Sequence, residues 1–149
     1  MPNIKRVSPS EAKHLLDQGY TYVDVRTAEE FEMGHPAGSL NVPLAVPGPG
    51  GSVMNPEFMA IIGKLFLKDA KLVMGCATGM RSLRAAEILM NAGYADVVDQ
   101  RAGFAGARSP FGGPAEPGWV AAGLPTSRGP DEGSYEAVKR RASSTFTGP

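Results

Sequence analysis

The chain has 149 residues, of which 42% are hydrophobic, and its 15 Lys and Arg residues equal its 15 Asp and Glu residues in number. This size and composition fit one domain with a continuous core, and a zero net charge provides no basic field that would attract nucleic acid or an anionic membrane. One cysteine excludes an intramolecular disulfide, and with only two distant histidines we expect neither a metal site nor a cofactor. Because no apolar run resembles a signal peptide or is long enough to span a bilayer, we expect a cytoplasmic protein.

Gly and Pro residues divide the first part of the chain into short strand and helix patterns. Ser8 with Glu11, and Thr27 with Glu30, have the spacing of a capping box, in which the two side chains satisfy backbone amides at the start of a helix. β-branched and aromatic residues favour a buried strand over 20–25. The predicted elements are a strand over 4–7, a helix from Ser8 to Gly19, a strand over 20–25, a brief helix from Thr27 to Gly34, and a strand over 40–42.

The second part of the chain opens with residues 43–54, where repeated Pro and Gly favour an irregular and mobile loop. Two later stretches carry apolar residues at the three-and-four spacing of one buried helical face. The predicted elements after the loop are a helix from Asn55 through Leu65, a strand over 71–74, a helix over 82–91 that Gly93 ends, and a strand over 95–98.

Strands that alternate with helices of this length predict an α/β fold, with a mainly parallel five-stranded sheet covered on both faces. We assign this domain to residues 1–127. Within it, residues 103–118 are rich in Gly, Pro and Ala and predict an irregular surface segment. Residues 128–149 mix charge, Ser and Gly with few large apolar side chains, which favours disorder, and a short helix over 135–141 is the alternative.

The most informative feature is Cys76, which directly follows a predicted strand and lies six residues before an amphipathic helix. Ligand sites of parallel sheets lie at this end of the strands. The intervening residues are mostly small, so the backbone can curl with its N–H groups inward, as in an anion-binding nest. The helix N-terminus and Arg81 add positive charge. Together these features favour a thiolate nucleophile that needs no histidine base.

An inert cysteine is the competing interpretation, because free cysteine is among the most buried residue types. A core cysteine normally lies within a strand or helix, whereas Cys76 begins a Gly-containing turn that leads to Arg81, so we favour the nucleophile. Only four residues separate these two. Cysteine phosphatases use a larger loop with room for a tetrahedral phosphate, so the shorter ring favours one sulfane sulfur, held as a persulfide.

Three motifs of the sequence resemble the rhodanese family of sulfurtransferases, in particular its single-domain members. The first is VDVRTAEEFEMGHPAGSLNVP at 23–43, and the second is CATGMRS at 76–82, which is similar to the six-residue active loop of the family. The third is Trp119 followed by Gly-Leu-Pro at 123–125. The resemblance covers residues 5 to 125 and implies a three-layer α/β sandwich with a central parallel sheet.

The resemblance also implies a double-displacement reaction without a cofactor. Cys76 would attack the outer sulfur of thiosulfate or a persulfide donor, and the resulting persulfide would pass its sulfur to cyanide, a thiol or a protein acceptor. Arg81 would guide the anionic donor, and Thr78 could add a hydroxyl. The residues expected to bind the substrate are Ala77, Thr78, Gly79, Met80, Arg81 and Ser82.

Charged residues of the first motif are expected to support the scaffold, because buried charges require partners. Arg26 could pair with Glu30 across the short helix, and Asp24 and His35 are expected to be structural as well. The family usually has two adjacent glycines where this chain has Arg-Ala-Gly at 101–103. About fifteen residues then separate Gly103 from Trp119 of the closing motif. We therefore expect an insertion at the rim of the site, which with residues 43–54 could form a lid or an acceptor-docking surface.

Two alternatives to a thiosulfate or persulfide sulfurtransferase follow from the sequence. The first is a sulfur-relay or persulfide-sensing module that acts with a protein partner, for which the Pro/Gly loops and the basic run at 139–141 are hints. The second is a phosphatase or arsenate reductase, which the short Cys76 loop disfavours.

Overall fold

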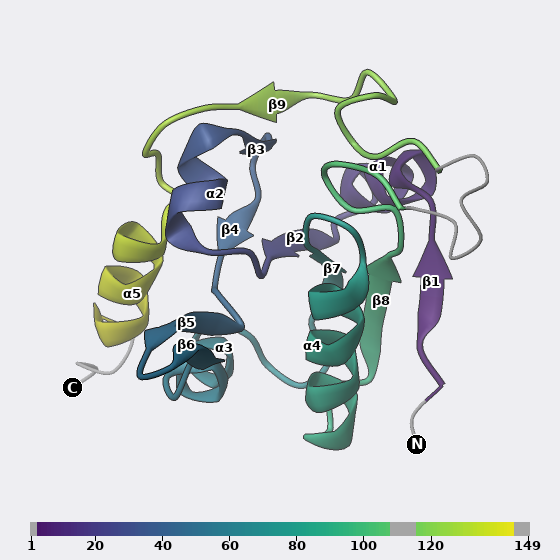
Figure 1. Ribbon diagram of the computed structural model, residues 1–149. Coiled ribbons are helices and arrows are strands. Elements are labelled where there is room, and N and C mark those ends of the chain that lie inside the picture. The colour runs from purple at the N-terminus through teal and green to yellow at the C-terminus, as the bar shows by residue number, and fades with distance from the viewer. Residues whose placement is uncertain (1–2, 108–115, 145–149) are drawn as a thin grey trace.

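Five parallel strands form the central sheet of the computed structural model, which describes residues 3–107 and 116–144 (Figure 1). The strand order is β1-β8-β7-β2-β4, and every neighbouring pair is parallel. This arrangement confirms the predicted α/β class and the five-stranded parallel sheet. The strands are β1 (Lys5–Val7), β2 (Thr21–Asp24), β4 (Leu40–Asn41), β7 (Lys71–Gly75) and β8 (Asp96–Gln100).

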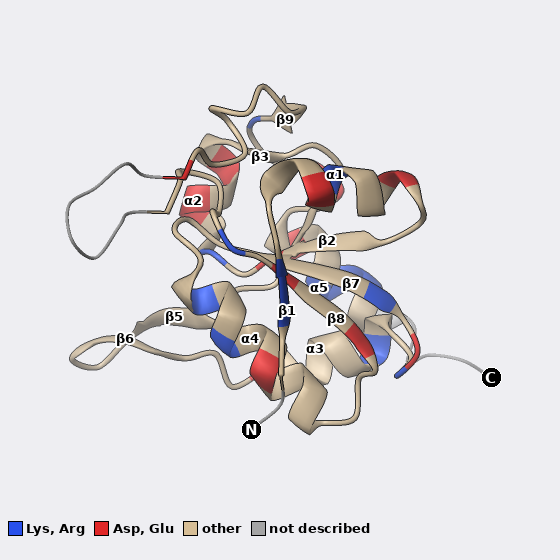
Figure 2. Cartoon of the chain, turned by 90° about the vertical axis from the view of Figure 1, so that its right-hand side faces the viewer, with Lys and Arg blue, Asp and Glu red and all other residues tan. Residues whose placement is uncertain are grey.

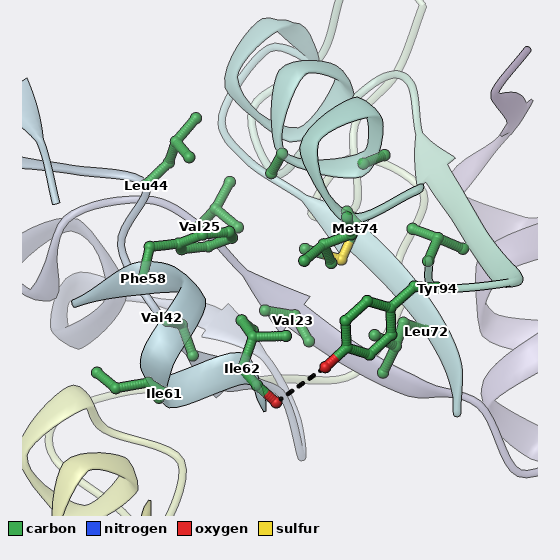
Figure 3. Packing of buried hydrophobic residues seen from close by; sticks show 14 of the residues in the cluster. Val23, Val25, Val42, Leu44, Phe58, Ile61, Ile62, Leu72, Met74 and Tyr94 are labelled. Carbon is green, nitrogen blue, oxygen red and sulfur yellow. Dashed lines mark hydrogen bonds between the residues drawn. The ribbon is translucent and has the colours of Figure 1, made fainter. Parts of the chain in front are cut away.

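Helices cover both faces of this sheet, because successive residues of its strands point to opposite sides. In β7, Leu72 and Met74 belong to one hydrophobic cluster and Val73 to the other. The larger cluster joins the sheet to α3, α4 and α5, and Figure 3 shows part of it, including the Tyr94 hydroxyl that donates to the Ile62 carbonyl. The smaller cluster joins the sheet to α1. The helices are α1 (Pro9–Asp17), α2 (Ala28–Met33), α3 (Phe58–Leu65), α4 (Met80–Asn91) and α5 (Tyr135–Ser144).

Local sequence signals fix the starts of α1 and α2 as predicted. The Ser8 hydroxyl accepts from the Glu11 amide while the Glu11 carboxylate accepts from the Ser8 amide, and Thr27 with Glu30 forms the same reciprocal pair. Both capping boxes are therefore confirmed. In contrast, α4 begins at Met80 rather than at residue 82, since the preceding Gly79 adopts a left-handed conformation and starts the helix there.

The prediction of irregular structure over 43–54 is wrong, because this segment forms a β-hairpin. β5 (Ala45–Gly48) pairs antiparallel with β6 (Gly51–Met54). Gly50 has φ +79°, a conformation that glycine tolerates in a tight turn. Pro47 is accommodated because a two-stranded ribbon has free edges on which a missing N–H costs nothing.

The expectation of disorder is also wrong for residues 128–144, where the helical alternative is found. β9 (Thr126–Ser127) pairs with β3 (His35–Pro36), and the chain then continues into α5. Val138 and Ala142, one turn apart on this helix, are 0% and 3% exposed and belong to the core cluster that includes α3. This narrow apolar stripe packs the segment against the rest of the domain. No helix within the described ranges is long and apolar enough to cross a membrane.

Candidate active site at the Cys76 loop

Cys76 lies where the sheet, a tight loop and a helix N-terminus meet. It directly follows β7, whose last residue, Gly75, is in register with Asp24 at the end of β2. The loop then runs into α4 at Met80. The fold therefore places Cys76 at the carboxyl edge of the strands, as the sequence predicts.

The sulfur of Cys76 is surrounded by hydrogen-bond donors, although Cys76 itself is only 2% exposed. The Gly79 amide donates to Sγ at 3.1 Å and the Ser82 amide at 3.3 Å. Of the amides predicted to form a cradle, these are the two with a hydrogen bond to Sγ in the described structure. Amide donors aimed at sulfur stabilise a negative charge on it, so the site is built to hold a thiolate or a persulfide anion.

The loop carbonyls point away from the sulfur because a neighbouring segment binds them. The Phe104 amide donates to the Cys76 carbonyl at 2.7 Å, and the Ala105 amide donates to the Ala77 carbonyl at 2.9 Å. A Cβ at Gly103 would lie 2.3 Å from the Ala77 carbonyl oxygen, so only glycine allows this close approach. Gly103 alone therefore allows the close approach between this segment and the Cys76 loop.

Asp99, which the sequence analysis did not select, is linked to the Cys76 sulfur through the Ser82 hydroxyl. The Cys76 thiol lies 3.4 Å from the Ser82 hydroxyl, which donates to the Asp99 carboxylate at 2.5 Å. The Asp99 side chain is 0% exposed and accepts from Arg6 Nε at 2.7 Å. Burial raises the pKa of the Asp99 carboxyl even though Ser82 and Arg6 lower it. A charged residue at the carboxyl end of a buried strand was the one signal that could have identified it.

Arg81 forms an ion pair with Glu30, which is a correction to the predicted Arg26–Glu30 pair. Arg81 Nη1 and Nη2 donate to the two carboxylate oxygens of Glu30 at 2.7 and 3.1 Å. The Arg81 hydrogen bonds are the main reason that the pKa of Glu30 is lowered to about 2. Arg26 instead pairs with Asp24 at 2.8 Å and donates to the Gly34 carbonyl at 2.6 Å, and both residues of that pair are buried.

The remaining predicted residues lie around the loop or far from the sulfur. Thr78 and Met80 are exposed, and they line a cavity of about 400 Å³ against the outer side of the loop together with Arg6 and Arg101. His35 is fully buried and contacts the C-terminal segment, since its Nε2 lies 2.7 Å from the Asp131 carboxylate.

No group of three or more His, Cys, Asp or Glu side chains that could hold a metal ion occurs in the part of the chain that the structure describes.

Comparison with known proteins agrees with this geometry. The rhodanese-like domain model matches residues 8–109. The chain is 36% identical over 120 residues to thiosulfate sulfurtransferase 16 of Arabidopsis thaliana, covering 80% of this chain and 90% of that protein. It is 33% identical over 104 residues to the thiosulfate sulfurtransferase GlpE of Pseudomonas savastanoi, covering 70% and 87% of the two chains.

A solved structure shares the fold as well. The crystal structure of Rv0390 from M. tuberculosis superimposes with a TM-score of 0.68 at 24% identity, covering 86% of this chain and all of that one. With the family model matching more than half of the chain, and with the Cys76 loop at the expected edge of the sheet, the chain belongs to the rhodanese-like family of sulfurtransferases.

Proposed function

We propose that this protein transfers a sulfane sulfur, from thiosulfate or a persulfide donor to cyanide or a thiol, through a persulfide on Cys76. The observation that carries the proposal is the pair of amides, from Gly79 and Ser82, that donate to the Cys76 sulfur. The same amides would stabilise the terminal sulfur of a persulfide anion. The names of the relatives, which are thiosulfate sulfurtransferases, support this assignment.

In the first half-reaction, the Cys76 thiolate attacks the outer sulfur of the donor. With thiosulfate, a new S–S bond forms to Cys76, the bond to the sulfonate sulfur breaks, and sulfite leaves with the electron pair. In the second half-reaction, cyanide or a thiolate attacks the outer sulfur of the Cys76 persulfide. Thiocyanate or a new persulfide leaves, and the Cys76 thiolate is restored.

Purified protein with thiosulfate and cyanide should therefore release thiocyanate and sulfite. Mass spectrometry after loading with thiosulfate alone should find one added sulfur on the peptide that contains Cys76, the single cysteine of the chain. Cys76→Ser, folded as judged by circular dichroism, is the matched control. If wild-type protein gains no sulfur from thiosulfate or from any persulfide, the proposal fails.

A sulfur relay with a protein partner is the second candidate function. Met80 supports it, because this apolar side chain is 72% exposed on the same loop as the reactive cysteine, where a partner could cover it. Persulfide loading of Cys76 without appreciable turnover of cyanide would favour the relay. The cytoplasmic location stays a prediction, and fractionation of the tagged full-length protein would test it.

A further inference from the structure

Among the described residues, Arg6, Arg81 and Arg101 lie on or beside the Cys76 loop, and each is paired with a carboxylate. Arg81 is held by Glu30 as described above, through two hydrogen bonds. Arg6 donates to Asp99 at 2.7 Å, and Arg101 makes two hydrogen bonds to Glu116 at 2.9 Å. Figure 2 colours the acidic positions of α2 red and the basic positions of α4 blue.

The other side chains of the loop carry no charge. Ala77, Thr78 and Met80 form its outer surface, and Met80 is its most exposed large apolar residue. A donor that approaches the sulfur therefore meets, among the described side chains, uncharged groups and compensated ion pairs. These side chains add no excess positive charge to attract an anion.

Charge separates the two classes of sulfur donor. Thiosulfate is a dianion, and it must approach a thiolate, so two like-charged groups come together unless a cation lies between them. A thiol persulfide carries at most one negative charge on its sulfur atoms, and none when its outer sulfur is protonated. Arg81 is the cation closest to this role, since its pKa is raised partly by the charge of Cys76, although the hydrogen bond to Glu30 is the larger cause.

We propose that Glu30 is a specificity-determining residue, which compensates Arg81 and makes a thiol persulfide, rather than thiosulfate, the preferred sulfur donor. The proposal rests on the proposed sulfurtransferase function and narrows its substrate class. In the loading step, the Cys76 thiolate attacks the outer sulfur of R–S–SH. The S–S bond of the donor breaks, R–S⁻ leaves with the electron pair, and Cys76–S–SH forms with the proton retained on the outer sulfur.

Glu30→Gln tests this proposal because it removes the charge and keeps the helix start. Gln at the third position of α2 still completes a capping box with Thr27. Glu29→Gln is the matched control, since it removes the same charge from the neighbouring residue of the same helical turn. The probes are sodium thiosulfate and 2-hydroxyethyl persulfide, whose alkyl group is uncharged. The measured quantity is the second-order rate constant for addition of one sulfur to Cys76 with each donor.

We expect wild-type protein and Glu29→Gln to load faster from the persulfide. In Glu30→Gln, the ratio of the thiosulfate rate constant to the persulfide rate constant should rise about tenfold, through a lower KM for thiosulfate, and the rise should shrink with added salt. A merely structural effect would change the rate constants for both donors by the same factor and leave their ratio unaltered. An unchanged ratio in Glu30→Gln, an equal change in Glu29→Gln, or faster loading of wild type from thiosulfate would overturn the proposal.

A second substitution identifies the cation. Adding Arg81→Gln to Glu30→Gln should abolish the gain, whereas adding Arg84→Gln, at an exposed position one turn further along α4, should leave it. If the rise in the rate-constant ratio is lost in the Glu30→Gln/Arg84→Gln double variant but kept in Glu30→Gln/Arg81→Gln, the role given to Arg81 is contradicted. If wild-type Cys76 gains sulfur from neither donor, the sulfurtransferase function itself fails, so the two failures are distinguishable.

Discussion

Ser82 and Asp99 are joined by a hydrogen bond inside the protein, and this bond lies directly behind the Cys76 sulfur. Both side chains are 0% exposed. Ser82 comes from the first turn of α4 and Asp99 from β8, so the bond also ties the loop to the sheet. Within the described residues, the side chains that donate to the buried Asp99 carboxylate are Ser82 and the partly exposed Arg6.

Asp99→Asn should be tolerated, whereas Asp99→Ala should not. Burial raises the pKa of Asp99, which means that burial penalises the charged form of this carboxyl, and Asn keeps the shape of the side chain without that charge. We expect Asn to change the free energy of unfolding at pH 7 by no more than about 1 kcal/mol. Ala removes the acceptor of Ser82 and should cost about 2 kcal/mol or more. Urea unfolding measures both, and equal losses would show that the charge of Asp99 is itself stabilising.

The pH dependence of the same variants provides a second test. Because the folded-state pKa of Asp99 lies above its unfolded value of about 3.9, the stabilisation from protonation is fully present below that value. It is lost as the pH rises through the folded-state pKa. Wild-type stability should therefore carry a component that falls as the pH rises from about 4, and Asp99→Asn should lack it. Identical pH profiles for the two proteins would contradict this expectation.

Gly103→Ala should disrupt the Cys76 loop. A Cβ at this position would lie 2.3 Å from the Ala77 carbonyl oxygen and 2.8 Å from that of Cys76. Gly129→Ala is the matched control, since Gly129 has the same φ of +73° and nothing within 4 Å of its added Cβ. The free energy of unfolding should fall by about 1 kcal/mol in the control, from backbone strain alone. In Gly103→Ala it should fall by about 2 kcal/mol more, because of the added clash.

Sulfur loading gives this comparison a functional readout. If the 103–106 segment keeps the loop carbonyls turned outward, Gly103→Ala should slow the formation of the Cys76 persulfide while Gly129→Ala should not. Equal loading rates in the two variants would show that the loop keeps its shape without this contact.

Features set by nearby residues were predictable from the sequence, and features set by distant pairings were not. The capping boxes at Ser8 and Thr27 need only residues three positions away, so both helix starts were correct. Cys76 was found because its loop, helix and Arg81 are contiguous in the sequence. Asp99 was missed because its partners Ser82 and Arg6 lie 17 and 93 residues away.

One error of secondary structure and one error of ion pairing have the same origin. Pro47 and its neighbouring glycines break most strands, and they are tolerated in β5 because this strand pairs only with β6. Arg26 was assigned to Glu30 on helical spacing, whereas the buried Asp24 and the Gly34 carbonyl hold it. Neither outcome can be derived without knowing which surfaces the fold brings together.

Asp131→Ala should loosen the segment that contains β9 and α5. The His35 ring is fully buried, with Nδ1 2.6 Å from the Phe31 carbonyl and Nε2 2.7 Å from the Asp131 carboxylate. Removal of the carboxylate leaves Nε2 without its partner and should cost about 1–3 kcal/mol. Glu132→Ala, at the exposed neighbouring position, is the control.

Limited proteolysis measures this effect locally. Cleavage within residues 126–144 should become faster in Asp131→Ala than in wild type or Glu132→Ala, because the contact between His35 and the segment is lost. If the cleavage rate is unchanged while global stability falls, His35 and Asp131 stabilise the core rather than the attachment of this segment.

Val138→Ala tests whether α5 is part of the cooperative core. Val138 is 0% exposed and belongs to the cluster that contains Phe58 and Ile62 of α3, so the loss of two methyl groups should leave a cavity. We expect a loss of about 2 kcal/mol in urea unfolding, with a single transition. Glu136→Ala, which removes only the exposed partner of Lys139, should cost about 0.5 kcal/mol or less. If the segment folded independently of the domain, Val138→Ala would leave the main unfolding transition unchanged. Residues 128–144 would then not belong to the cooperative core.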